Sequence, residues 1–373
     1  MGEPIPHNGR VLGPVYFCGA FPANQLVKVL ILKPSSLGDV VQALPVLRLL
    51  KKGLPASEVY WWLDANLAPL LEGDPDLSGI IAFERRRWRS PLRWPEAWRS
   101  LQLIRRQRFD WVIDLQGLLR SGLVAWLANG QLTIGVEDHR EGAPAFYDVR
   151  VPRPSYYTHA VDWYLAALPV VGVPVHWDFQ WLPQRPAVAA RLREKWPVDG
   201  SRWIVLHPGA RWLNKRWPVE HFAELVRLFS ASHSAARFVI LGAPADSELG
   251  RTIAHAAPGR CLELAGKTSL AEMIEWIRLS ELTITNDTGP MHVAAALRKP
   301  VVAIFGPTEP RRTGPYGQIE RVIRSDLPCI PCMKDVCRFE KPIECLRAIS
   351  PQIIFARAQQ RLSESSAESP RVE

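Results

Sequence analysis

Short apolar runs alternate with helical patterns along most of the chain, and this alternation constrains the fold more than any other feature. In the first half, apolar runs that are typical of buried strands cover residues 27–32, 59–63, 80–83 and 111–115. Helical patterns separate them, over residues 40–52, 67–71 and 118–127. Buried strands joined by helices predict a parallel sheet with helices on both faces.

The same alternation starts again after a proline-rich stretch that contains Pro169, Pro174, Pro183 and Pro186. Strands are predicted at residues 203–206, 238–241, 282–285 and 301–305, and helices at 222–229 and 270–279. A chain of 373 residues is also long enough for two domains. We therefore predict an α/β protein with two facing Rossmann-like domains at residues 26–185 and 186–350. Residues 1–25 form an extension, and residues 351–373 form a C-terminal helix and tail.

Residues 282–297 are the strongest candidate for a ligand site. They predict a strand, a polar turn and then an apolar helix, with Asp287 or Thr288 suited to cap the helix. Gly289 allows a ligand to approach the backbone closely, and a helix N-terminus attracts anions such as a diphosphate. The alternative is a capped turn with no ligand.

Three further loops follow predicted strands and are expected to meet the first one in a cleft, because ligands gather beyond the carboxyl ends of parallel strands. Asp39 begins a helix, either as its cap or as a carboxylate facing substrate. Arg211 and Lys215 lie in a third loop. Their positive charges either neutralise a bound phosphate or are simply exposed to solvent. Asp246 is placed either to contact a ribose or to cap a helix. The sequence contains no Walker A motif and no dinucleotide glycine fingerprint.

Positive charge is concentrated in residues 84–108. This segment holds nine arginines and two glutamates, whereas the whole chain has a net charge of +9. Trp88, Trp94 and Trp98 are interleaved with the arginines. Such a segment attracts anionic lipid headgroups or an anionic acceptor. A nucleic acid is a weaker alternative because no binding motif accompanies the charge, and a solvated basic helix is a third.

The chain has no apolar run long enough to span a bilayer, and residues 11–23 make a poor signal peptide. The six cysteines are therefore expected to be reduced, in a cytosolic setting. Four of them have the spacing C-x2-C-x4-C-x7-C and could hold a structural Zn²⁺, although the spacing is not that of a zinc ribbon. Packed, reduced thiols are the alternative. These residues are Cys329, Cys332, Cys337 and Cys345.

Four motifs together resemble the lipopolysaccharide heptosyltransferase family, glycosyltransferase family 9. They are SSLGDV at residues 35–40, KRWP at 215–218, NDTGPMH at 286–292 and FGPT at 305–308. They occur in the family's order and spacing, over residues 27–351. The arginine cluster and DLQGL at residues 114–118 are most similar to the enzyme that adds the first heptose. HPGA at 207–210 and the late cysteines are more similar to the second-heptose branch.

The resemblance implies a GT-B fold that binds ADP-heptose mainly with the C-terminal half and a Kdo–lipid A or core oligosaccharide acceptor with the N-terminal half. Asp39 would be the catalytic base. Donor contacts are implied for Arg211, Lys215, Asp246, Thr268, Asp287, Thr288, Gly289 and His292. Acceptor contacts are implied for Arg85, Arg86, Arg87, Arg89, Gln116 and Arg120. The chain departs from the first-heptose enzymes at Ala210 and Arg211, where those have paired threonines, and at Asp246, where they have Glu.

This reading predicts an inverting transfer without a required cofactor or catalytic metal, because Lys215 and the start of the helix at Thr288 can stabilise the leaving ADP. The enzyme would work at the cytoplasmic face of the inner membrane as a peripheral protein, with no nucleic-acid partner. The alternatives are a GT-B transferase for another nucleotide sugar and a nucleotide-sugar epimerase. A non-catalytic protein that binds anionic lipid or RNA is the alternative outside the enzymes.

Overall fold

The computed structural model of the chain describes residues 26–84, 91–138, 141–196, 198 and 202–368. Its first domain is built on a six-stranded sheet in the order β3-β2-β1-β4-β5-β6, whose neighbouring strands pair in parallel. The strands are β1 (Lys28–Leu32), β2 (Glu58–Asp64), β3 (Gly79–Phe83), β4 (Trp111–Asp114), β5 (Leu132–Val136) and β6 (Val149–Val151). This is the strand order of a Rossmann sheet, in which the chain reverses direction across the sheet between β1 and β4.

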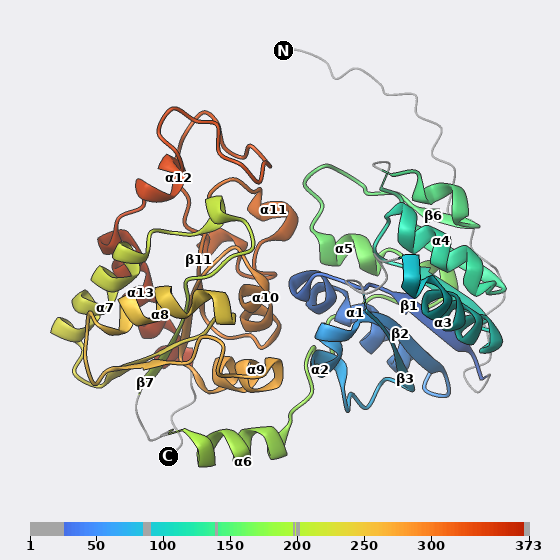
Figure 1. The fold of residues 1–373 in the computed structure, drawn as a ribbon, viewed down its shortest axis with the longest axis horizontal. Coiled ribbons are helices and arrows are strands. Elements are labelled where there is room, and N and C mark those ends of the chain that lie inside the picture. The colour runs from blue at the N-terminus through green and yellow to red at the C-terminus, as the bar shows by residue number, and fades with distance from the viewer. Residues whose placement is uncertain (1–25, 85–90, 139–140, 197, 199–201, 369–373) are drawn as a thin grey trace.

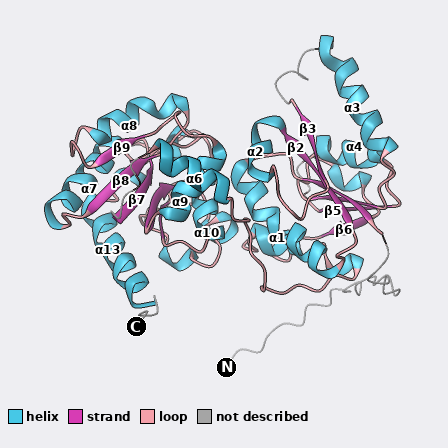
Figure 2. Ribbon diagram, turned by 90° about the horizontal axis from the view of Figure 1, so that it is seen from below, coloured by secondary structure: helices cyan, strands magenta, loops and turns pink. Residues whose placement is uncertain are grey.

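Helices cover both faces of the first sheet, because successive side chains of its buried strands point to opposite faces. In β1, Val29 and Ile31 pack with α1 and α5, whereas Leu30 and Leu32 pack with α3 and α4. Figure 2 shows α1 on one side of the sheet and α3 and α4 on the other. The helices are α1 (Leu37–Gly53), α2 (Ala68–Leu71), α3 (Trp94–Arg106), α4 (Leu119–Ala128) and α5 (Ala160–Leu165).

The second domain has the same layered architecture, with a five-stranded parallel sheet in the order β11-β10-β7-β8-β9. Its strands are β7 (Arg202–His207), β8 (Ala236–Ile240), β9 (Cys261–Glu263), β10 (Leu282–Asn286) and β11 (Val301–Ile304). Its helices are α6 (Pro186–Lys195), α7 (Val219–Ser232), α8 (Ser247–Ala254), α9 (Leu270–Leu279), α10 (Gly289–Ala296), α11 (Pro310–Thr313), α12 (Glu344–Arg347) and α13 (Pro351–Glu368). Helices α7 and α13 cover one face of this sheet, and α9 and α10 cover the other.

The two domains face each other through helices that are near the switch points of both sheets (Figure 1). Helix α1 packs against α10, and α2 packs against α9. One hydrophobic core includes side chains from α1, α9 and α10 and is therefore continuous across the domain boundary. The N-termini of α1 and α10 are brought together by this packing, which places the loops after β1 and β10 in one region.

The predicted fold class, two facing Rossmann-like domains, is confirmed. The predicted boundary between residues 185 and 186 stays a prediction, and α6 after it packs against α9 of the second domain. One helix start was wrong: α1 begins at Leu37 rather than at residue 40, so Asp39 lies within the first helical turn. The predicted extension at residues 1–25 lies outside the described residues.

Candidate active site

A cavity of about 550 Å³ lies where the two domains meet. The N-terminal turn of α1 lines it from the first domain, and the loops after β7, β8 and β10 line it from the second domain. Because β1 lies beside β4, and β7 beside β10, the cavity is at the switch point of both sheets. Eight predicted site residues line it: Asp39, Arg211, Lys215, Asp246, Asp287, Thr288, Gly289 and His292.

Asp39 presents a partly exposed carboxylate to this cavity from the first turn of α1. One oxygen, Oδ2, accepts hydrogen bonds from the Ser36 backbone N–H at 2.8 Å and the Ser36 hydroxyl at 2.7 Å. Both interpretations of Asp39 therefore hold in part, since it caps the helix and also faces the cavity. The other oxygen, Oδ1, has no hydrogen bond within the described residues and is free to meet a ligand.

Lys33 lies behind Asp39 and was not predicted as a site residue. Its ammonium is buried and donates to the Leu115 carbonyl at 2.9 Å and the Tyr164 hydroxyl at 2.8 Å. Burial raises the pKa of Asp39, but Lys33 and the hydrogen bonds from Ser36 outweigh it, and the pKa lies below its usual value. Asp39 is therefore ionised at neutral pH, which is the protonation state a general base needs.

Lys215 and Asp287 form an ion pair at the opposite wall, with 2.6 Å between Nζ and Oδ2. The same Asp287 oxygen accepts a hydrogen bond from Thr308. Lys215 also lies over the ring of Trp212, with its ammonium 4.7 Å from the ring centroid. Asp287 therefore fixes the Lys215 ammonium at the cavity. Of the two residues expected to cap the following helix, Thr288 occupies the N-cap position, whereas the carboxylate of Asp287 is used in this pairing.

The N-terminus of α10 borders the cavity beside this ion pair. Thr288 is the N-cap residue, but its hydroxyl makes no capping bond and its buried Oγ1 has no hydrogen-bond partner. A phosphate oxygen at this position would satisfy that hydroxyl. Burial holds the pKa of His292 below its usual value, so its ring is neutral at pH 7. Thr288, Gly289 and His292 therefore all border the cavity at the start of α10.

Glycine allows the two helix N-termini to approach each other here. A Cβ at Gly38 would lie 2.4 Å from the His292 ring, and a Cβ at Gly289 would lie 2.6 Å from Leu37. Contacts of this length cannot be accommodated without movement of the helices or of the ring. The two glycines therefore set the distance between Asp39 and the start of α10.

Asp246 lines the cavity from the loop after β8. Its Oδ2 accepts from the Ala243 backbone N–H at 3.0 Å, and Arg216 lies 3.3 Å from its Oδ1. It therefore caps a short helix and lines the cavity at the same time. Arg211 is exposed and lines the cavity.

The remaining predicted contacts do not line this cavity. Thr268 lies in the loop before α9, outside the lining, although Gly266 in the same loop packs tightly against Pro244 near Asp246. Gln116 and Arg120 follow β4 in the first domain and also lie outside the lining. The four arginines at 85, 86, 87 and 89 lie outside the described residues.

Besides Lys33, sequence reasoning missed Asn286, Trp212 and Gln42, which line the cavity or support its lining. Asn286 holds the loop after β7 in place with two hydrogen bonds. Its side chain donates to the Pro208 carbonyl at 2.7 Å and accepts from the Trp217 N–H at 3.0 Å. Trp212 supports Lys215, and Gln42 lines the cavity one turn after Asp39. The helical spacing from Asp39 to Gln42 was the available signal for Gln42.

The four late cysteines line one small enclosed cavity next to α12. Burial and the neighbouring thiols raise the pKa of Cys345 to about 11, and the Ile343 N–H donates to the Cys337 sulfur at 3.3 Å. Within the described residues, however, no group of three or more His, Cys, Asp or Glu is arranged as a metal site. The thiols are close to one another without forming a ligand shell.

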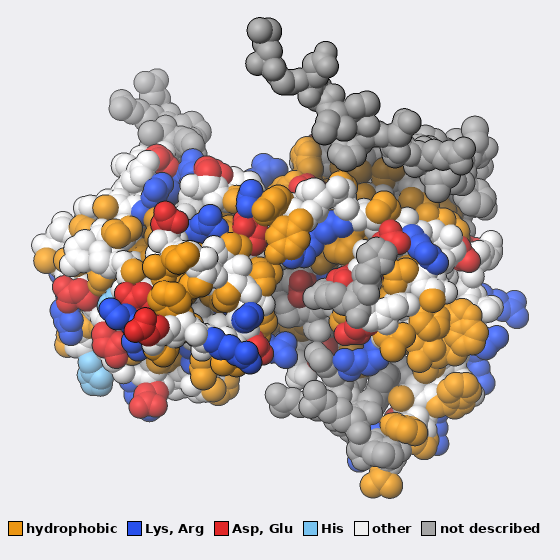
Figure 3. Space-filling view, turned by 90° about the horizontal axis from the view of Figure 1, so that it is seen from above, with side chains coloured by type: hydrophobic (Ala, Val, Ile, Leu, Met, Phe, Trp, Pro, Cys, Tyr) orange, Lys and Arg blue, Asp and Glu red, His pale blue; other side chains and the backbone are white. Residues whose placement is uncertain are grey.

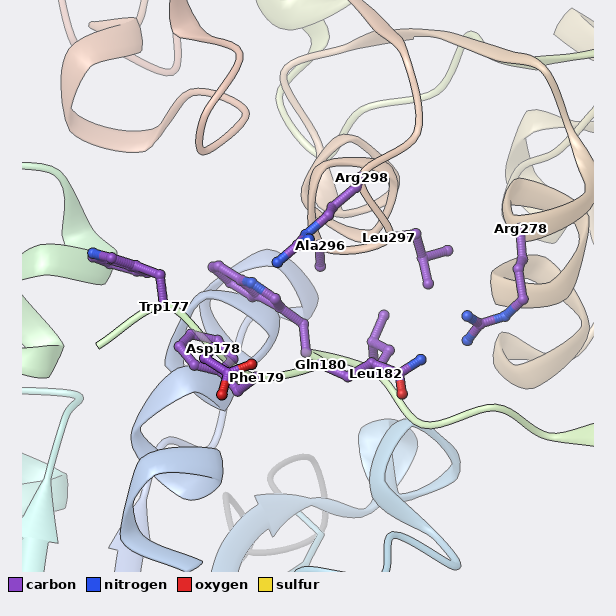
Figure 4. A pocket seen from close by; sticks show the side chains of 10 residues that line it. Trp177, Asp178, Phe179, Gln180, Leu182, Arg278, Ala296, Leu297 and Arg298 are labelled. Atoms are coloured by element: carbon purple, nitrogen blue, oxygen red, sulfur yellow. The ribbon is translucent and has the colours of Figure 1, made fainter. Parts of the chain in front are cut away.

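A second cavity, of about 430 Å³, lies between the domains at the other end of α10 (Figure 4). Arg278 and Arg298 point toward it from the second domain, and the linker residues 177–182 line the opposite side. None of the predicted site residues lines it. The cavity near Asp39 is therefore the candidate active site.

Two parallel-sheet domains that face each other across such a cavity define the GT-B class of glycosyltransferases. The family model for glycosyltransferase family 9 (heptosyltransferase) matches residues 97–343. The lipopolysaccharide heptosyltransferase 1 of Pseudomonas aeruginosa is 30% identical over 330 residues, which cover 84% of this chain and 88% of the relative. The chain belongs to glycosyltransferase family 9 and is a glycosyltransferase.

Solved structures of both heptosyltransferase branches share the fold. Escherichia coli ADP-heptose LPS heptosyltransferase II is 25% identical, with a TM-score of 0.73, and the match covers 91% of this chain and 100% of that one. E. coli heptosyltransferase WaaC with ADP is also 25% identical, with a TM-score of 0.71 and the same coverage. These values do not separate the two branches.

Proposed function

We propose that this glycosyltransferase moves a heptose from ADP-heptose to the Kdo or inner-core region of lipopolysaccharide. The observation that carries the proposal is the cavity in which a free Asp39 carboxylate oxygen faces a fixed cation and a helix N-terminus from the other domain. The relative from P. aeruginosa is a lipopolysaccharide heptosyltransferase, and the solved WaaC structure holds ADP. Both support an ADP-linked heptose as the donor.

In the reaction, a hydroxyl oxygen of the acceptor attacks the anomeric carbon of the heptose, and the bond from that carbon to the ADP oxygen breaks. Asp39 takes the hydroxyl proton through its free oxygen. The pair of electrons leaves with ADP, whose added negative charge is stabilised by Lys215, Arg211 and the start of α10. Attack opposite the leaving group inverts the anomeric configuration. No metal is assigned to this step, since the cavity supplies fixed positive groups.

The decisive experiment combines the chain with ADP-heptose and Kdo–lipid A and follows the acceptor by mass spectrometry. We expect a mass gain of one heptose in the wild type and a loss of at least about 100-fold in kcat for Asp39→Asn, with ADP affinity unchanged. The variant Asp39→Asn keeps the size of the side chain but cannot accept the proton. A variant that retains the wild-type rate would rule out Asp39 as the base.

The same assay separates the alternatives. A panel of other nucleotide sugars, run with the same acceptor, identifies a transferase for a different sugar. An epimerase would convert the nucleotide sugar without any acceptor. A heptosylated acceptor that forms only with ADP-heptose supports the proposal, and its absence with every acceptor tested contradicts it.

We further propose that the enzyme is a peripheral protein at the cytoplasmic face of the inner membrane. The support is a surface on the first domain where apolar and basic side chains lie side by side (Figure 3). In α3 and just before it, Leu92, Trp94, Trp98 and Leu103 are exposed, and Arg93, Arg99, Arg105 and Arg106 are exposed beside them. Among the described residues, no helix combines the length and apolarity needed to cross a bilayer.

A structural zinc ion at Cys329, Cys332, Cys337 and Cys345 is a separate proposal. Its support is the convergence of the four side chains on one enclosed cavity, and binding would require the thiols to move closer together. We expect elemental analysis of the purified protein to find about one zinc per chain, with the metal lost in Cys332→Ser and retained in Cys261→Ser. Protein that contains no stoichiometric zinc would contradict this proposal.

A further inference from the structure

Gln42 is a buried polar side chain with an unpaired atom at the edge of the candidate active site. It is 2% exposed, lines the cavity, and its Nε2 has no hydrogen-bond partner. An amide that is buried without a partner costs stability, about 1–3 kcal/mol. Where such a group borders a cavity, a ligand can complete its hydrogen bonds.

The other buried polar side chain of α1 shows the contrast. Arg48 is 6% exposed, and its guanidinium is paired with Asp74, Asp76 and the Trp181 carbonyl. Arg48 lies at the far end of the helix, away from the cavity. Of these two buried side chains, Gln42 is the one whose amide nitrogen has no hydrogen-bond partner within the described residues.

The position of Gln42 identifies the chemistry of its partner. Residues three apart share a helix face, so Gln42 lies beside Asp39 on the side of α1 that borders the cavity. The cations of the site, such as Lys215, belong to the second domain, across the cavity. The atom that lacks a partner is the Nε2 donor. A sugar hydroxyl on the first-domain side of the cavity can accept its hydrogen bond, whereas the lysine that would hold a diphosphate belongs to the opposite domain.

We propose that Gln42 hydrogen-bonds a hydroxyl of a sugar at the reacting centre and so contributes to the choice of that sugar. This inference rests on the proposed function. The hydroxyl belongs either to the transferred heptose or to the acceptor sugar.

The test is Gln42→Met, which keeps the length of the side chain and removes its polar atoms. We expect kcat/KM to fall about tenfold or more, with ADP affinity unchanged and thermal stability equal to or above that of the wild type. If the hydroxyl is on the donor, the Kd for ADP-heptose rises while that for ADP does not. If it is on the acceptor, ADP-heptose binding is unchanged and the acceptor KM rises.

The matched control is Thr283→Val. Thr283 is also fully buried with an unpartnered Oγ1, but it lies in β10 outside the cavity lining, so its variant should keep wild-type kinetics. If Gln42→Met does not fold, Gln42→Asn keeps the amide but withdraws it by one carbon and is expected to lose activity in the same way.

Two outcomes would overturn the inference: kcat/KM of Gln42→Met within twofold of the wild type, or an equal loss of ADP affinity. The wild type is assayed in parallel. A wild type that transfers no heptose refutes the proposed function itself, whereas an active wild type with an equally active Gln42→Met refutes this inference alone.

Discussion

At the scale of single residues, the candidate site depends on a buried ammonium whose two hydrogen-bond acceptors are neutral. Lys33 donates to the Leu115 carbonyl and to the Tyr164 hydroxyl, and it has no ion pair within 4 Å among the described residues. A buried charge without a counter-charge is costly. Burial lowers the pKa of Lys33, but Tyr164 and the carboxylates of Asp39 and Asp114 outweigh it, and the pKa lies above its usual value. Lys33 and Asp39 therefore stabilise each other's charged form.

This coupling predicts the pH dependence of the reaction. The charged and polar groups that face Asp39 are Lys33 after β1, Ser36 at the start of α1, Tyr164 on α5 and His292 on α10. Because the pKa of Asp39 is depressed, the base is present above that pKa and is lost only as the pH falls through it. Lys33→Met should raise the pKa and move the acid limb of kcat/KM upward by about one pH unit.

The matched control for this experiment is Lys51→Met at the far end of α1, where the ammonium binds the Pro55 and Ser57 carbonyls. It should leave the acid limb in place. Circular dichroism at each pH shows that the protein stays folded over the range used. A Lys33→Met variant that is slower, but has an unshifted acid limb, would show that Lys33 has only a structural role.

At the scale of helices and strands, the sequence predicts those elements whose side chains are nearly all apolar. Strands β1, β4, β10 and β11, which are buried almost throughout, were predicted close to their observed bounds, because burial on both faces favours apolar residues at most of their positions. Strand β9 was missed because it has three residues, all only partly buried. The start of α1 was misplaced because the Ser36–Asp39 hydrogen bonds, which fix it, depend on side-chain geometry.

The candidate site could also be predicted from the sequence only in part. Loops at the carboxyl ends of strands could be predicted to meet, and eight of the predicted residues do line one cavity. The pairing of Lys215 with Asp287 could not be predicted, because the two residues are 72 positions apart and their distance depends on tertiary packing. Gln42 was missed for a different reason: its helical spacing from Asp39 was a signal, but that spacing does not tell whether the side chain is buried at the cavity.

The close approach of α1 and α10 gives a prediction about this pair of helices. Gly38→Ala should displace the His292 ring or separate the helix N-termini, since its Cβ would lie 2.4 Å from the ring. We expect unfolding to be easier by about 1–3 kcal/mol, and kcat to fall at least about tenfold.

Denaturant unfolding and steady-state kinetics measure the two effects. Gly53→Ala, at the other end of α1, is the control: its Cβ would lie 3.1 Å from a Val173 methyl, a contact that small movements relieve. Wild-type kinetics in Gly38→Ala would mean that the spacing of the two helices does not matter for the reaction.

At the scale of the whole molecule, apolar surface is concentrated on one side of the first domain. Helix α4 adds Leu119, Leu123 and Trp126 to the exposed residues of α3, and their spacing places them on one helix face. The two helices pack against each other, so their apolar residues belong to one surface. Exposed Trp and Leu beside arginine are typical of proteins that bind at the interface of an anionic membrane.

This surface predicts binding to anionic lipid that depends on both helices. Vesicles of phosphatidylglycerol and phosphatidylethanolamine should bind the wild type, and the paired substitution of Trp98→Gln and Trp126→Gln should lower the partition coefficient about tenfold or more, because two large apolar side chains no longer enter the interface. Added salt should weaken binding through the arginines.

The control is Trp177→Gln, since Trp177 is 48% exposed but lies in the linker between the domains. If the paired variant and the control bind vesicles equally, the α3–α4 surface does not contact the membrane. The acceptor would then have to be drawn from the bilayer by another face of the molecule.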